Sequence, residues 1–345
     1  MYKKQVLDKY FIDLLVNLNH AQFIDTVKLQ LIMTQTLNNK LYEILDILSN
    51  IILGKPKQLK LSLVCLLAQG HLLIEDLPGM GKTTLAHALA KILGLEFHRI
   101  QFTSDILPGD ITGSSIYKRS NESFEFHKGP IFTQVVLADE INRASPKSQS
   151  ALLEAMEEGQ VTADGQTYEL PKPFFVIATQ NSFSQIGTYP LPESQLDRFL
   201  IRITLGFPER EFERRLLSGN DSRQQIAQLI SKISIEELKT VQRNIGNITV
   251  SDALYDYLQD LINATRESNQ WSHGLSPRAG LSVLKASKAW AFLEGRQYVI
   301  PEDVQSVWCA VTEHRLLTES LKNSNKIESN SNPVESLLQQ IPIPR

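Results

Sequence analysis

Residues 72–85 read LLIEDLPGMGKTTL, and this stretch decides the fold of the chain. Its first three residues form a short apolar run of the kind that makes a buried parallel strand. Residues 76–81 form a tight turn, and the helical pattern LAHALAKIL follows and ends near Gly94. A strand, a glycine-containing loop, the sequence GKT and a helix, in this order, predict a phosphate-binding loop. The usual form of that loop begins with glycine, whereas this chain has Asp76 at that position.

We expect this loop to bind the phosphates of ATP together with Mg²⁺. Gly79 and Gly81 let backbone N–H groups point at phosphate oxygens, and the positive end of the helix dipole lies at the same place. Lys82 would reach the β- and γ-phosphates, and the Thr83 hydroxyl would bind Mg²⁺. The residues expected to contact the nucleotide are Leu77, Pro78, Gly79, Met80, Gly81, Lys82, Thr83 and Thr84.

Polar residues also follow two later apolar runs. Asp139 and Glu140 come directly after the apolar residues 135–138. Together with the phosphate-binding loop, they predict that Asp139 holds Mg²⁺ through water. Glu140 would be the general base for the water that attacks the γ-phosphate. Asn181 follows the strand predicted at residues 174–178 and would contact the γ-phosphate or the attacking water; taken alone, it is more simply a turn asparagine.

The chain divides into an α/β part and a helical part. Apolar runs predict five strands, at residues 72–74, 96–102, 135–138, 174–178 and 199–205. The expected fold class is therefore α/β with a parallel five-stranded sheet, and from residue 208 to about residue 317 the pattern is helical, which predicts a small all-α domain. The domains expected are an N-terminal helical extension (1–40), a nucleotide-binding domain (41–207), the all-α domain (208–317) and a C-terminal tail (318–345).

The bulk properties fit a cytoplasmic protein. The 345 residues carry a formal net charge of -3, with a pI of about 6.2, which argues against a constitutive nucleic-acid binder. The chain has two cysteines, Cys65 and Cys309, in apolar surroundings and with no metal-binding spacing, which suits a reducing compartment. We expect no signal peptide, because the N-terminal residues lack its apolar core and its small-residue cleavage site. We expect no membrane span, because no window reaches the roughly 18 apolar residues of a spanning helix.

Several longer motifs resemble those of the MoxR family of AAA+ ATPases, and the resemblance covers nearly the whole chain from Ile51. The motifs that carry it are IEDLPGMGKT (74–83), QFTSDILPGDITGS (101–114), GPIFTQVVLADEINRASPKSQSALLEAMEEGQV (129–161), VIATQNS (176–182), YPLPESQLDRF (189–199), GLSPRAGL (274–281) and IPIPR (341–345). Ser182 departs from the proline that is more usual there. The resemblance implies a P-loop AAA+ core followed by an all-α lid.

The resemblance also implies roles that spacing alone does not give. Arg198 would be the arginine finger that reaches the ATP of a neighbouring subunit, and Arg278 would be the sensor 2 arginine, acting in its own subunit or in the neighbour's. An arginine at the start of a helix opposes the helix dipole, which favours a functional role for Arg278. The implied assembly is a homo-oligomeric ring, of hexameric size. The implied activity is chaperone-like maturation of partner proteins, alongside proteins with a von Willebrand factor A domain and including metal insertion.

Two other functions stay open from the sequence. A nucleic-acid-stimulated motor is one, because related AAA+ branches contain helicases, although the acidic pI weighs against it. A nucleotide-gated scaffold with little turnover is the other. The presence of Asp139, Glu140, Asn181 and Arg198 favours hydrolysis over such a scaffold.

Overall fold

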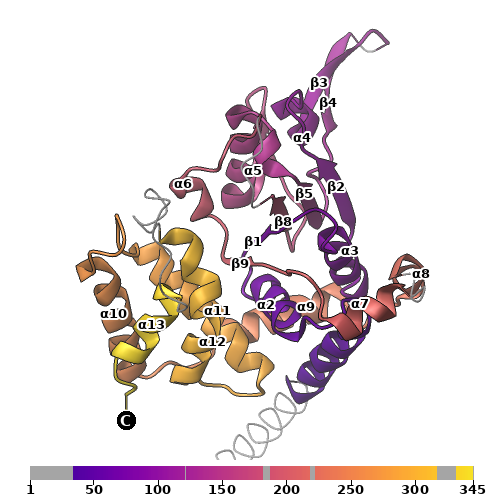
Figure 1. Ribbon diagram of the computed structural model, residues 1–345. Coiled ribbons are helices and arrows are strands. Elements are labelled where there is room, and N and C mark those ends of the chain that lie inside the picture. Colours follow the sequence, from indigo (N-terminus) through magenta and orange to yellow (C-terminus); the bar gives the residue numbers. More distant parts are fainter. Residues whose placement is uncertain (1–33, 121, 182–186, 218–221, 317–331, 345) are drawn as a thin grey trace, which may run out of the picture.

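The computed structural model describes residues 34–120, 122–181, 187–217, 222–316 and 332–344 (Figure 1). Most of the N-terminal extension expected at residues 1–40 and the first part of the tail expected from residue 318 lie outside these ranges. Among the described residues, no helix combines the length and apolar character that crossing a membrane requires.

A five-stranded sheet, parallel at every pairing, forms the centre of the α/β domain, in the order β2-β5-β8-β1-β9. Its strands are β1 (Leu72–Glu75), β2 (Phe97–Gln101), β5 (Val135–Asp139), β8 (Phe175–Gln180) and β9 (Ile201–Ile203). The predicted fold class is confirmed. Because side chains alternate along a strand, Leu72 and Ile74 belong to one apolar core and Leu73 to another.

Helices cover both faces of the sheet (Figure 1). The core on one face includes α2 (Pro56–Leu67), α3 (Lys82–Ile92) and the helix described over residues 34–51. The core on the other face includes α5 (Pro146–Glu158). Two antiparallel hairpins stand apart from the sheet: β3 (Gly113–Lys118) with β4 (Ser123–Lys128), preceded by α4 (Pro108–Thr112), and β6 (Gln160–Ala163) with β7 (Gln166–Glu169). Short turns of helix, η1 (Ile141–Arg143) and α6 (Glu193–Leu196), follow β5 and precede β9.

The helical lid follows β9. Its elements are α7 (Arg210–Leu217), α8 (Ser222–Gln228), α9 (Ile235–Gly246), α10 (Asp252–Glu267), α11 (Pro277–Leu293), α12 (Pro301–Thr312), η2 (Glu313–Arg315) and α13 (Pro333–Gln340). Ser234, Ser251 and Ser276 each accept a hydrogen bond from a backbone N–H three residues on, and so cap the starts of α9, α10 and α11.

The described parts of the expected N-terminal extension and C-terminal tail pack into the two domains. The helix over residues 34–51 passes through the boundary expected at residue 40, and Leu41, Ile44 and Leu48 on it are buried in the core. In the expected tail, α13 packs against α12: Trp308 of α12 donates its indole N–H to the carbonyl of Val334 of α13 over 3.1 Å. The boundaries at 40, 207 and 317 stay predictions.

His71, just before β1, ties the sheet to α5. Its Nδ1 accepts from the backbone N–H of Val176 over 3.0 Å, so Nε2 carries the proton and donates to the carbonyl of Met156 over 3.1 Å. Burial lowers the pKa of His71 to about 4. A second proton would remove the acceptor that Val176 needs, so the neutral ring is the one that the fold requires.

We expect this histidine to make the protein sensitive to mild acid. The unfolded chain binds a proton at His71 below its ordinary pKa of 6.5, whereas the folded chain binds it only near 4. Stability is therefore lost as pH falls from 6.5 to 4, by up to about 3 kcal/mol. Urea unfolding at several pH values measures this loss. A His71→Asn variant should be less stable at pH 7 and show a shallower slope over this range; parallel slopes would contradict the assignment.

Candidate active site

The phosphate-binding loop joins the carboxyl end of β1 to the first turn of α3. Gly79 and Gly81 have φ angles of 85° and 86°, in the left-handed region that side chains disfavour. A Cβ built at either glycine would meet no atom of the described residues within 4 Å. The space beside both glycines is therefore open, as the close approach of a phosphate to the loop would require. Pro78 and Thr83 are exposed at this opening, and Leu77, Met80 and Thr84 are half-buried.

Asp76 explains the departure from the glycine of the usual loop. Its buried carboxylate accepts three backbone N–H bonds: one from Leu77 (3.0 Å) and two from Leu205 and Gly206 (2.6 and 2.7 Å). The last two residues lead the chain out of β9 toward the lid. A glycine at position 76 would leave these donors without their acceptor. The aspartate therefore anchors the phosphate-binding loop to the exit from the sheet.

Lys82 opens α3 and lies over the loop. Its ammonium donates to the carbonyls of Asp76 (2.7 Å) and Leu77 (3.2 Å). Burial lowers the pKa of Lys82, and the nearby carboxylates of Asp76, Asp139 and Glu140 act in the opposite direction. A half-buried cation with carbonyl partners is well placed to exchange them for phosphate oxygens.

Asp139 and Glu140 end β5 and are held by a residue that the sequence did not single out. The Thr179 hydroxyl donates to Asp139 Oδ1 over 2.6 Å and accepts from the backbone N–H of Glu140 over 2.9 Å. Glu140 has a left-handed φ of 58°, which is costly for a residue with a side chain. Thr179 is fully buried and compensates this strain with its hydrogen bonds. Its only signal in the sequence is a hydroxyl residue in an otherwise apolar strand.

Two arginines, also missed from the sequence, pair with these carboxylates. Arg99 on β2 donates to Asp139 Oδ2 through Nε (3.1 Å) and Nη2 (2.5 Å). Arg143 donates to Glu140 over 2.8 Å, and the same oxygen accepts from Gln101 over 3.3 Å. Both arginines are about half exposed. Their charges balance the carboxylates at the end of β5.

Asn181 follows β8, which lies between β1 and β5 in the sheet. The strand ends therefore bring Asn181 between the segments that carry Lys82 and Asp139. Its Oδ1 atom is buried and has no hydrogen-bond partner among the described residues. A buried polar atom of this kind normally has a partner, so the Oδ1 atom of Asn181 is suited to accept a hydrogen bond from a ligand group or an ordered water.

These residues fit ATP with Mg²⁺. The open glycine loop and Lys82 suit phosphates, and the oxygens of Thr83 and Asp139 are the type of ligand that Mg²⁺ prefers. Within the part of the chain that the structure describes, no cluster of three or more histidine, cysteine, aspartate or glutamate side chains forms an independent metal site.

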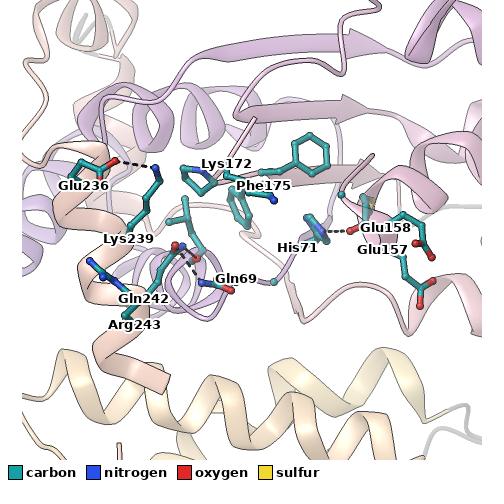
Figure 2. A pocket seen from close by; sticks show the side chains of 16 residues that line it. Gln69, His71, Glu157, Glu158, Lys172, Phe175, Glu236, Lys239, Gln242 and Arg243 are labelled. Carbon is teal, nitrogen blue, oxygen red and sulfur yellow. Dashed lines mark hydrogen bonds and ion pairs between the residues drawn. The ribbon is translucent and has the colours of Figure 1, made fainter. Parts of the chain in front are cut away.

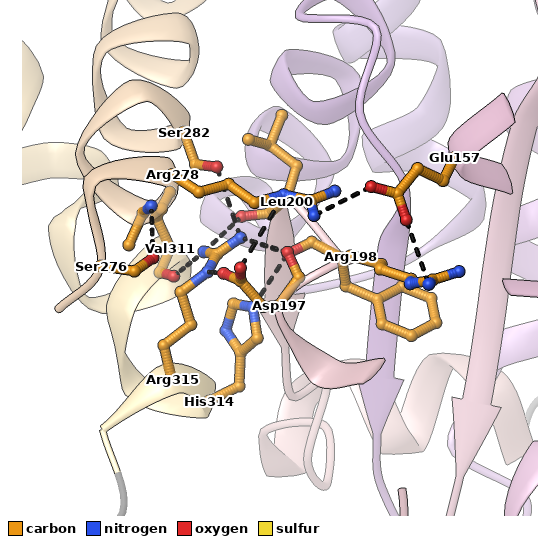
Figure 3. A network of polar contacts seen from close by, with 12 residues as sticks. Glu157, Asp197, Arg198, Leu200, Ser276, Arg278, Ser282, Val311, His314 and Arg315 are labelled. Carbon is orange, nitrogen blue, oxygen red and sulfur yellow. Dashed lines mark hydrogen bonds and ion pairs between the residues drawn. The ribbon is translucent and has the colours of Figure 1, made fainter. Parts of the chain in front are cut away.

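Arg198 and Arg278 lie at the other end of the sheet, beside the residues that precede β1. Figure 3 shows both side chains at Glu157. Both donate to the carboxylate of Glu157, each over 3.1 Å and each to a different oxygen. A cavity of about 270 Å³ here is lined by both arginines and by Gly70 and His71, which precede β1. The phosphate-binding loop follows β1, whose four residues span about 13 Å. The structure thus brings these arginines together with each other and not with Lys82 of the same chain.

A second cavity, of about 620 Å³, lies beside the first, between α9 and the amino ends of the strands (Figure 2). Its charged lining residues have both signs, and two of them, Lys239 and Glu236, pair with each other over 3.0 Å. Its lining does not favour one class of ligand, so we leave it outside the candidate site.

Comparisons with known proteins agree with this geometry. The family described as "ATPase family associated with various cellular activities (AAA)" matches residues 71–201, and the AAA lid domain matches residues 263–337. The chain is 47% identical over 270 residues to "Uncharacterized protein YeaC" of Bacillus subtilis, covering 78% of this chain and 84% of that protein. It is 41% identical over 291 residues to "Chaperone MoxR1" of Mycobacterium tuberculosis, covering 82% and 76%. The crystal structure of a "putative ATPase" from Cytophaga hutchinsonii matches with a TM-score of 0.81 and 36% identity, over 91% of this chain and 97% of that one.

We expect Lys82→Ala to lose tight ATP binding, because it removes the only cationic side chain of the loop 76–84. ATP at a hundredfold excess over Kd would stabilise the wild-type fold by about 2.7 kcal/mol. Thermal unfolding with and without Mg-ATP measures this gain. Lys91→Ala is the matched control, because Lys91 is a half-buried lysine of the same helix α3 that donates to the carbonyl of Ala227 over 2.6 Å; this variant should keep the full shift. A shift of wild-type size in Lys82→Ala would exclude this loop as the site.

Proposed function

Because the chain belongs to the MoxR family of AAA+ ATPases, we propose that it hydrolyses Mg-ATP in a ring of identical subunits and uses this cycle to remodel or mature partner proteins. The observation that carries the proposal is the gathering of Lys82, Asp139, Glu140 and Asn181 at the carboxyl ends of three neighbouring strands. One of the similar proteins is named as a chaperone, which supports the chaperone part of the proposal.

Each side chain has one task in the proposed reaction. Lys82 and the loop N–H groups bind the β- and γ-phosphates, and Thr83 and Asp139 would hold Mg²⁺, whose charge neutralises the phosphates. Glu140 accepts the proton of the attacking water, and the free oxygen of Asn181 orients that water. Thr179 fixes the backbone and carboxylate geometry on which both acidic residues depend.

We further propose that Arg198 and Arg278 both act in trans, on the nucleotide of the next subunit. Support comes from their position at the amino end of β1, at the opposite end of the sheet from their own phosphate-binding loop. A head-to-tail arrangement in which this end of one subunit meets the loop of the next closes into a ring. We propose a cytoplasmic hexamer, with client maturation that includes metal insertion alongside a von Willebrand factor A domain protein.

Glu140→Gln should bind ATP and hydrolyse it at least about 10²-fold more slowly, since the amide keeps the shape of the side chain and loses the base. Steady-state ATPase rates and the thermal shift with Mg-ATP measure the two effects separately. Glu154→Gln, the same change on an exposed position of α5, serves as the control. Near-normal turnover in Glu140→Gln would remove this residue from the mechanism.

Mixing two inactive variants tests the trans assignment. Arg198→Ala alone should bind ATP and lose about 10³-fold or more in rate. In rings that also contain Glu140→Gln subunits, some interfaces pair an intact Glu140 with an intact Arg198 of the neighbour, and these should regain activity. ATPase rates across mixing ratios, with subunit exchange verified, measure the recovery. Verified mixed rings without recovery would contradict action in trans, and recovery by monomers in light scattering would contradict the ring.

A further inference from the structure

The short helix η2 of the lid binds the segment that carries Arg198 (Figure 3). All three η2 residues take part. Glu313 accepts from Arg202 of β9 over 2.9 Å, and the buried His314 donates from Nε2 to the carbonyl of Phe199 over 3.0 Å. Burial lowers the pKa of His314 well below its ordinary value, so its ring is neutral. Arg315 completes the set.

Arg315 contacts the backbone on both sides of Arg198. Its Nη2 donates to the carbonyls of Asp197 (3.2 Å) and Phe199 (2.7 Å), the two residues on either side of Arg198. Its Nη1 donates to the carbonyl of Leu200 over 3.3 Å, and its Nε donates to the Asp197 carboxylate over 2.7 Å. The Arg315 side chain is only 4% exposed. Only a guanidinium has enough donors in one plane to make these contacts together.

Charges alternate outward from Arg315 to the surface. Asp197 pairs with Arg315 at 2.7 Å and approaches Arg278 at 3.8 Å. Glu157 then pairs with Arg278 and with Arg198. Exposure is lowest at Arg315 and reaches 50% at Arg278. The row therefore has a buried end at Arg315 in the lid and is most exposed at Arg278, and Arg198 at its other end is 28% exposed.

We propose that Arg315 is a positioning residue for the arginine finger, holding the backbone around Arg198 in place so that the neighbouring subunit's nucleotide can be reached. The inference rests on the proposed action of Arg198 in trans. Arg315 itself touches neither substrate nor water in this scheme. Its defect should therefore appear at the neighbour's site and leave its own phosphate-binding loop intact.

Arg315→Lys is the direct test. Lysine keeps the charge, but its single nitrogen cannot reach all the acceptors that Nε, Nη1 and Nη2 of Arg315 contact separately. We expect kcat to fall between about 10- and 100-fold, the usual scale for misplacing a reacting group by about 1 Å. The Kd for ATP, measured by titration, should change by less than about threefold. The matched control is Arg296→Lys, because Arg296 also pairs with an aspartate of the lid, Asp303, and does not contact the segment 197–202.

Mixed rings separate positioning from general damage. Arg315→Lys mixed with Glu140→Gln should regain activity, because the first provides an intact site and the second an intact finger. Arg315→Lys mixed with Arg198→Ala should not, because both fail at the same interface. The opposite pattern would mean that Arg315 acts on its own site. Recovery in neither mixture would mean general damage, and wild-type kcat in Arg315→Lys would also overturn the proposal.

Two further measurements keep the outcome decisive. If Arg315→Lys does not fold, Asp197→Asn weakens the same contact from the other side and should give the same mixing pattern. The mixture of Arg198→Ala with Glu140→Gln is run in parallel as the reference. Failure of the reference overturns the trans mechanism itself. If the reference recovers and the mixtures of Arg315→Lys and of Asp197→Asn with Glu140→Gln both fail to recover, only the positioning role is overturned.

Discussion

All five strands of the central sheet run in one direction, and this constraint arranges everything else. The carboxyl ends of parallel strands meet at one edge, which is where open α/β sheets bind ligands. The phosphate-binding loop, Asp139 and Asn181 all follow strands and therefore share that edge. Arg198 precedes a strand, so the same polarity puts it at the opposite edge. In the ring that we propose, a head-to-tail partner brings the arginines of one subunit to the phosphate-binding edge of the next.

Local signals allowed much of this site to be predicted from the sequence. Two signals did this: the glycines of the phosphate-binding loop, and the polar residues that come directly after apolar runs. Each acts on the backbone within a few residues. Their geometry follows from backbone sterics and hydrogen bonding that any chain obeys. The observed strand order puts β5, β8 and β1 side by side, so Asp139, Asn181 and the loop before Lys82 lie at the ends of neighbouring strands.

The partners that hold the site were beyond such reasoning, because they are distant in sequence. Asp139 pairs with Arg99 across 40 residues, Asp76 accepts from Leu205 across 129, and Arg315 binds Asp197 across 118. Each contact depends on which face of which element meets another, and no periodicity encodes that. Asp76 shows the consequence: the sequence marks it as a departure from a pattern, whereas the fold uses it as a buried acceptor.

The ion pairs of Arg202 also connect the two edges of the sheet. Arg202 donates to Glu75, the residue before Asp76, over 2.6 Å. It also donates over 2.9 Å to Glu313 of η2, the helix that contains Arg315. Such contiguity allows coupling between sites only if some member has two discrete positions. Arg202 is 26% exposed and Arg315 is 4% exposed, so water can replace the Arg202 bonds more easily. The lid therefore contacts the segment of Arg198 through a buried arginine and reaches the phosphate-binding edge through the more exposed Arg202.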